Sequence, residues 1–307
     1  MTAVPRPPWD SATGDVPRRR RASGAWPYIT PLLVMLGVWI YGPTLATLVL
    51  SVLDWNLTGP PAGFVGLDNF ARLVREPEFG QAARQTLLYA LALLPFSTIV
   101  PLVLAIMLWL RPGRASAIYR SLLFVPVMVA PVALAVSWRF LLNPLNGLAN
   151  KVIGWFGLPA VNWLGDPATA LLVIVVVTAA RVVAFNMLLY SAALATIDRR
   201  TIEAARLEGA TSGEVVSFIV APQLVRTTVL LGLLSIVLAG QWAFTNISVL
   251  TQGGPDGVTD NIYYRVYTLG FEFFETGTAS AASVLVLAFF GLAALAAAAT
   301  RRRRGTA

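Results

Sequence analysis

Residues 203–222, EAARLEGATSGEVVSFIVAP, form a polar stretch between two strongly apolar segments. The stretch holds three glutamates, one arginine, two glycines and a final proline. A hydrophobic chain places such a segment in its middle when two buried or membrane-embedded segments are joined through water. The local structure of this stretch and its position between apolar segments therefore decide the fold.

The first half of the stretch has the signals of a short helix. Asp198 or Thr201 can cap a helix that begins near Ile202. Glu203 then lies in the first turn, where the helix dipole favours a carboxylate. Gly209 suits the left-handed conformation that ends many helices. We therefore predict a helix that stops at Gly209.

The second half has the signals of another short helix. Thr211 is followed three residues later by Glu214, which is the spacing of a capping box. Pro222 should end or bend this helix. Ala204 and Ala205 have small side chains, so another surface could approach the first helix closely. The sequence thus predicts a helical hairpin with a break at Gly209.

The composition indicates a membrane protein. The 307 residues are 57% hydrophobic and 12% charged, whereas ordinary soluble domains are about 25% charged. The chain has no cysteine and no histidine, so it lacks thiol chemistry, the commonest metal ligand and the commonest general base. Lys151 is the one lysine and lies outside any phosphate-loop motif. If ATP is used, another subunit must bind it.

Six apolar stretches are long enough to cross a bilayer, which needs about 20 residues. Prolines inside the second and third stretches are expected to kink them. The stretches are approximately 28–50, 86–110, 118–141, 169–191, 225–247 and 278–300.

The basic residues indicate the orientation. With the N-terminus in the cytoplasm, sixteen of the 23 arginines and lysines face inward and five face outward. The net charge of +8 is explained by this arrangement, so we expect no nucleic acid partner. We predict a disordered cytoplasmic tail over 1–26, a transmembrane domain over 27–300 with its polar loop at 198–222, and a basic cytoplasmic C-terminus over 301–307.

The loop resembles a known signature. Its pattern is Glu203-Ala204-Ala205, three residues, Gly209, nine residues, Ile219, one residue, then Ala221-Pro222. This resembles the EAA loop of binding-protein-dependent ABC importer permeases, in which leucine usually precedes the proline. The stretches 66–70, 185–197 and 249–286 also resemble the carbohydrate and glycerol-3-phosphate permeases of that family, which includes the maltose transporter.

The resemblance implies an all-α integral membrane protein of the type I ABC importer fold, with about six transmembrane helices and a cytoplasmic coupling hairpin. It implies a non-catalytic permease in the cytoplasmic membrane, with both termini inside. The implied partners are a second permease, a homodimeric ATPase that binds ATP and magnesium, an extracytoplasmic solute-binding protein or lipoprotein, and membrane lipid. The residues implied in ATPase coupling are Glu203, Ala204, Ala205, Gly209, Ile219 and Pro222.

Polar and aromatic residues within the spans are candidates for a solute path, because polar groups at membrane depth are costly and usually functional. Asparagine and glutamine can instead bond neighbouring helices, and an arginine can pair with the partner permease. The candidates are Arg181, Asn186, Gln241, Trp242, Phe244, Thr245 and Asn246.

The solute itself stays open among sugars, glycerol-3-phosphate and glycerophosphodiesters. A secondary transporter is the main alternative, although no acidic residue lies in a span core to couple ion movement. A membrane enzyme is disfavoured because the sequence shows no paired carboxylates and has no histidine or cysteine.

Overall fold

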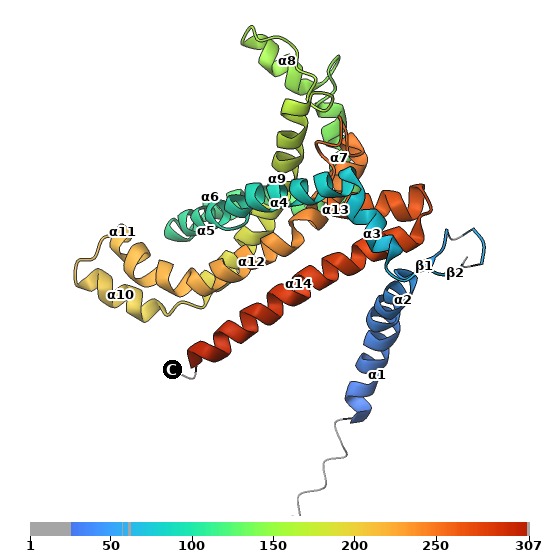
Figure 1. The fold of residues 1–307 in the computed structure, drawn as a ribbon. Coiled ribbons are helices and arrows are strands. Elements are labelled where there is room, and N and C mark those ends of the chain that lie inside the picture. The colour runs from blue at the N-terminus through green and yellow to red at the C-terminus, as the bar shows by residue number, and fades with distance from the viewer. Residues whose placement is uncertain (1–25, 57, 61–62, 306–307) are drawn as a thin grey trace, which may run out of the picture. The chain divides into compact units, whose positions relative to one another are not determined.

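The structure is a computed structural model that describes residues 26–56, 58–60 and 63–305, with only the backbone described over 297–305. The predicted tail over 1–26 therefore lies almost wholly outside the described residues, as do the last two residues of the predicted basic C-terminus. The described chain is helical apart from one small sheet (Figure 1). It divides into two compact units between Val49 and Leu50.

The first unit holds one continuous span. It consists of α1 (Trp26–Leu36), the π-helical turn η1 (Gly37–Tyr41) and α2 (Gly42–Leu50). None of the residues described over 26–50 is buried, and Trp39 is 73% exposed. Such an apolar helix needs lipid or another protein around it.

The second unit holds the remaining spans (Figure 1). The second span comprises α4 (Pro77–Ser97) and α5 (Ile99–Leu110), and it starts nine residues earlier than predicted because Pro77 opens the helix outside the apolar stretch. The fourth span is α9 (Pro167–Ala195). The last is α14 (Thr276–Gly305), of which Thr276–Ala296 is apolar enough to cross a membrane.

The third predicted span is broken. It consists of α6 (Arg114–Met128) and α7 (Pro131–Leu141), which meet at an angle of 98°. The reason is local: Ala130 precedes a proline and is extended, with ψ 135°, and the residue before proline is disfavoured in a helix. The prediction of one kinked helix over 118–141 is therefore wrong. The described residues contain five continuous spans, or six if this bent pair counts as one.

Short elements connect the spans. Strands β1 (Leu53–Asp54) and β2 (Gly63–Phe64) pair antiparallel, with Leu53 opposite Phe64. The other connecting elements are α3 (Asp68–Arg75), α8 (Leu148–Trp155), α10 (Arg199–Leu207), α11 (Ser212–Glu214), α13 (Ile262–Tyr267) and the π-helical turn η4 (Thr268–Glu272).

The fifth span belongs to one continuous helix of 40 residues, Ser212–Thr251, whose first residues lie in the polar loop. It runs through α11, the π-helical turn η2 (Val215–Val220), α12 (Ala221–Asn246) and the π-helical turn η3 (Ile247–Thr251). α12 packs against both α4 and α9, and α4 packs against α9. These three helices form the centre of the second unit.

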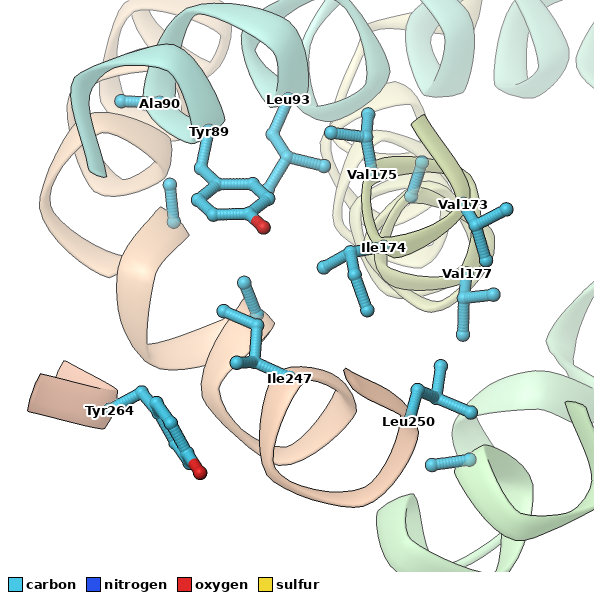
Figure 2. Close-up of a cluster of buried hydrophobic side chains, with 14 of the residues drawn as sticks. Tyr89, Ala90, Leu93, Val173, Ile174, Val175, Val177, Ile247, Leu250 and Tyr264 are labelled. Carbon is cyan, nitrogen blue, oxygen red and sulfur yellow. The ribbon is translucent and has the colours of Figure 1, made fainter. Parts of the chain in front are cut away.

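Figure 2 shows the largest buried cluster, where these helices meet. Tyr89 and Leu93 of α4 face Ile174 of α9 and Ile247 of η3. The Tyr89 hydroxyl donates a hydrogen bond of 2.9 Å to the carbonyl oxygen of Thr259. In a bilayer such contacts stabilise through close packing and hydrogen bonding, because lipid tails are as apolar as the side chains.

Candidate functional site

The first helix of the loop is capped by Asp198. Its carboxylate accepts a hydrogen bond of 2.9 Å from the backbone N–H of Arg200, so α10 begins at Arg199, three residues earlier than predicted. The alternative cap, Thr201, lies inside the helix. The Asp198 cap is therefore confirmed and the predicted start is corrected. Glu203 consequently lies in the second turn of α10, so the prediction that it lies in the first turn is wrong.

The first helix ends at Leu207, and Gly209 has the left-handed backbone predicted for the stop that follows it. Gly209 has a φ of +90°, and its N–H donates to the carbonyl of Arg206 at 3.1 Å. The N–H of Ala210 donates to the carbonyl of Ala205 at 3.0 Å. This pair of bonds is the Schellman motif, which satisfies the last carbonyls of a helix.

The capping box that starts the second helix is also confirmed. The N–H of Glu214 donates to the Thr211 hydroxyl at 3.3 Å, and the N–H of Thr211 donates to the Glu214 carboxylate at 2.7 Å. The backbone hydrogen bond, and then the bond from the hydroxyl, hold the pKa of Glu214 below its ordinary value. The box therefore favours the ionised carboxylate.

The second helix is not short, and Pro222 does not end it. Pro222 lies in the first turn of α12, directly after the π-helical turn η2, in which the Ala221 N–H donates to the Val216 carbonyl. A proline ring clashes with the carbonyl four residues earlier in an ordinary α-helix, and a wider turn relieves that clash. The loop is therefore one short helix followed by the start of the fifth span.

One face of the loop is fastened to the spans. Ile202, Val215 and Val220 are buried in one cluster with Tyr190 and Leu194 of α9. Five further residues of this cluster come from α5, α9, the short link between α9 and α10, and α12. The loop and the adjoining ends of these spans therefore form one packed unit.

The opposite face of the loop is open. Glu203, Ala204, Gly209 and Pro222 are exposed, whereas Ala205 and Ile219 are half-buried against the cluster. Leu207 is 90% exposed and was missed in the sequence. Its signal was its spacing, since a residue four positions after Glu203 lies on the same face of a helix. Six residues that resemble a coupling signature thus fall into an exposed group and a packed group.

A cavity of about 600 Å³ lies between the first loop helix and the ends of α5, α6 and α9. Glu203 lines it together with Arg120, Arg199 and Arg206. The charged lining of this cavity is therefore predominantly basic, with one carboxylate.

A second cavity, of about 540 Å³, lies within the span bundle. It brings together residues from α6, α7, α9 and α12, including five of the seven residues proposed from the sequence for a solute path. Those five are Arg181, Gln241, Trp242, Thr245 and Asn246. We call this space the bundle cavity.

The other two candidates lie outside the lining of the bundle cavity. Asn186 is 2% exposed and its side-chain amide donates to the carbonyl of Ser97 at 2.8 Å. Phe244 packs against Tyr264 and Tyr267, with ring centroids 6.4 and 5.6 Å apart. Both side chains therefore contribute to packing between elements of this chain.

A third cavity, of about 370 Å³, surrounds the turn after the fifth span. The turn needs left-handed backbone at four positions: Gln252, Gly253, Asp256 and Gly257. Asp260 lines this cavity, and burial raises the pKa of its carboxyl to about 6, against a hydrogen bond from the Asn261 N–H that lowers it. Arg265 pairs with Glu76 at the same place.

Comparison with known proteins identifies relatives that are membrane transport subunits. No family model matches the chain. It is 30% identical over 284 residues to the probable ABC transporter permease protein y4oQ of Sinorhizobium fredii, covering 89% of each chain. It is 30% identical over 265 residues to the sn-glycerol-3-phosphate transport system permease protein UgpA of Pectobacterium atrosepticum, covering 85% of this chain and 88% of that protein. It is 29% identical over 286 residues to the lactose transport system permease protein LacF of Rhizobium radiobacter, covering 91% and 94%.

The fold also matches a solved structure. A chain of a bacterial ABC transporter involved in the import of alginate superposes with a TM-score of 0.78 at 22% identity, covering 90% of this chain and 94% of that one. The spans and the polar loop thus define an all-α membrane protein with the fold of an ABC importer permease. The chain belongs to the family of ABC transporter permease proteins. The predicted fold class and family are confirmed, and the secondary-transporter alternative is not favoured.

Proposed function

We propose that this chain is the non-catalytic permease subunit of an ATP-driven importer in the cytoplasmic membrane. Its solute would be a sugar or a related compound, such as glycerol-3-phosphate or a glycerophosphodiester. The observation that carries the proposal is the loop over 198–222, which has the spacing of a coupling signature, an open face and a face packed on α9. The relatives named for sn-glycerol-3-phosphate and lactose support the solute range.

In this proposal the open face of the loop docks on an ATPase subunit. Glu203 provides charge, Ala204 allows close approach, and Gly209 sets the turn. Ala205, Ile219 and the buried cluster transmit the movement to α9 and α12 as a rigid body. ATP binding on the partner would then bias two arrangements of the spans, inward-facing and outward-facing. Pro222 stays with the moving unit because the helix is continuous through it.

The partners follow from what this chain lacks and from its relatives. It has no phosphate-loop motif, so ATP and magnesium would bind to a separate ATPase homodimer. A second permease would complete the transmembrane pore. A related transporter has been solved in complex with an alginate-bound periplasmic protein, which supports an extracytoplasmic solute-binding partner here.

We assign the solute path to the bundle cavity. Arg181, Gln241, Trp242, Thr245 and Asn246 would contact the solute, because they share that cavity. Amide and hydroxyl groups suit sugar hydroxyls, and the Trp242 ring offers a flat face for sugar C–H groups. Asn186 and Phe244, which the sequence also suggests, would act through helix packing.

Two loop variants test the coupling assignment in the assembled transporter. Glu203→Lys reverses the exposed charge, and Gly209→Val forces a β-branched residue into left-handed backbone. Both should insert normally but lose most of the co-purifying ATPase or its solute-stimulated hydrolysis. The matched controls are Asp54→Lys, an exposed charge reversal in β1, and Gly213→Ala, where a Cβ meets only a side-chain oxygen at 4.0 Å. Normal ATPase retention and transport in both loop variants would refute the assignment.

Orientation has its own test, because the chain contains no cysteine. Ser212→Cys adds one thiol to the exposed loop. A membrane-impermeant maleimide should label it in inside-out vesicles and not in intact cells. Labelling from outside would show that the loop is not cytoplasmic.

A further inference from the structure

Arg181 stands at the centre of the fourth span. Fourteen residues of α9 precede it and fourteen follow it, so each end of the helix is roughly 21 Å away along the axis. A charged side chain at this depth is costly and is normally paired or placed in a polar cavity. Arg181 lies in the lining of the bundle cavity.

The described residues supply no negative charge to Arg181. The ion pairs found among them involve Arg265 only. Within the described spans, the acidic residues Glu78 and Glu214 lie in first turns, far along the chain from any span centre. The cationic guanidinium therefore faces the bundle cavity without a counter-charge from the part of this chain that the structure describes.

The surrounding polar side chains have hydrogen-bonding groups that no described residue satisfies. Gln241, Trp242 and Thr245 line the cavity, and their side chains make no hydrogen bond with any described residue. The indole N–H can only donate, and the guanidinium can only donate. Apolar side chains such as Leu134, Val177 and Leu238 complete the wall, and an apolar wall strengthens the attraction between opposite charges.

We infer that the solute entering the bundle cavity carries an anionic group, a carboxylate or a phosphate, that pairs with Arg181. Gln241, Trp242 and Thr245 then bond the rest of the solute. This inference rests on the proposed function and narrows its solute class. It also explains why a permease carries a lone arginine at membrane depth: the counter-charge arrives with each solute molecule.

The electrostatic part can be tested without knowing the solute. In the complete transporter, purified through a tag on this chain, Thr245→Cys or Gln241→Cys places a thiol in the cavity of a chain that otherwise has none. The thiol is treated with sulfonatoethyl methanethiosulfonate and with trimethylammonioethyl methanethiosulfonate, which carry opposite charges. Mass spectrometry of this chain measures how much of its introduced thiol has reacted, so thiols of other subunits do not contribute.

The anionic reagent should react faster than the cationic reagent. Arg181→Gln should lower the ratio of the two rates by about tenfold, whereas the control Arg226→Gln, an exposed arginine at the start of α12, should leave it unchanged. A ratio that does not respond to Arg181→Gln at either reporter would overturn the inference, because it would mean that the partner permease already neutralises the arginine.

A second arm identifies the anionic group. sn-Glycerol-3-phosphate and glucuronate are compared with glycerol and glucose for protection of the cavity thiol. We expect a phosphate or a carboxylate compound to slow labelling with Arg181 present and not with Arg181→Gln. Equal protection by the neutral compounds in both backgrounds would contradict the inference. Because ATPase docking is measured separately on the loop variants, a negative result here leaves the coupling proposal intact.

Discussion

The side-chain amide of Asn246 in α12 donates a hydrogen bond of 2.8 Å to the hydroxyl of Thr178 in α9, and both side chains are buried. This bond joins the fourth and fifth spans at the edge of the bundle cavity. Thr178 lies three residues before Arg181, so the bond joins the two helices close to the arginine that we propose pairs with the solute. Both residues of this contact line the bundle cavity.

Breaking that hydrogen bond should lower the stability only slightly, but the effects of changing its two residues should not be additive. Thr178→Val and Asn246→Ala should each destabilise the permease, and together they should cost less than the sum of the two. Hydrogen bonds between membrane helices average about 0.6 kcal/mol in such cycles. The measurement is a double-mutant cycle of unfolding in detergent or bicelles. Strict additivity would show that the bond contributes nothing to the pairing of the two spans.

Gly277 should not tolerate a side chain. A Cβ there would lie 2.3 Å from the carbonyl oxygen of Leu53 and 2.8 Å from the side-chain nitrogen of Asn69. That nitrogen already donates to the carbonyls of Ser51 and Leu53. Gly277→Ala should therefore destabilise the second unit by about 1–3 kcal/mol.

The matched control for that change is Gly291→Ala, in the same helix, where nothing lies within 4 Å of the added Cβ. It should be neutral or slightly stabilising, because alanine has a higher helix propensity than glycine. Thermal unfolding of the purified complex compares the two variants. Equal melting temperatures would contradict the predicted clash.

Thr211 should matter through its capping box. Thr211→Ala removes the hydroxyl that bonds Glu214, and loss of such a cap costs about 1 kcal/mol. Amide hydrogen exchange over residues 212–216 should then be roughly fivefold faster. Thr211→Ser keeps the hydroxyl and should preserve protection. In the alanine variant the pKa of Glu214 should rise toward its ordinary value. The stability that the ionised Glu214 carboxylate adds to the loop should then be lost at a higher pH during acidification than in the natural protein. Unchanged exchange in the alanine variant would show that the box is dispensable.

Asp260 should make stability depend on pH in one direction. Its pKa of about 6 lies above the ordinary value of 3.8 because burial disfavours the carboxylate. The folded state thus binds the proton more tightly than the unfolded state, and the free energy of unfolding falls as pH rises from about 4 to about 6, then levels off. Asp260→Asn should remove this component.

The test is thermal unfolding of the complex in buffers from about pH 4.5 to about pH 8. The melting temperature of Asp260→Asn relative to the natural protein should be higher at the upper end of the range than at the lower end. The difference between the two proteins cancels the titration of the other carboxylates. A constant difference across the range would contradict the raised pKa.

The membrane class, the approximate places of the apolar spans and the caps of the loop could all be predicted from the sequence alone. These features depend on signals that act within about 20 residues. Long apolar stretches require lipid, and the cap at Asp198, the left-handed end at Gly209 and the box of Thr211 and Glu214 need only their neighbours in the chain. The resemblance to ABC permeases rests on the same local spacing.

Which polar residues meet could be seen only in the packed helices. The bundle cavity is shared by Arg181 of one span and by Gln241, Thr245 and Asn246 of another. The side chain of Asn186 instead bonds the carbonyl of Ser97. The reason is that helix packing sets the rotation of each helix about its axis, which sequence periodicity does not specify. The break of the third span at Ala130 is local, because that residue precedes a proline. The fifth span continues through Pro222 because the wider turn η2 before it relieves the clash of the proline ring. Both prolines are visible in the sequence, but only the backbone around each one shows whether the helix breaks or continues.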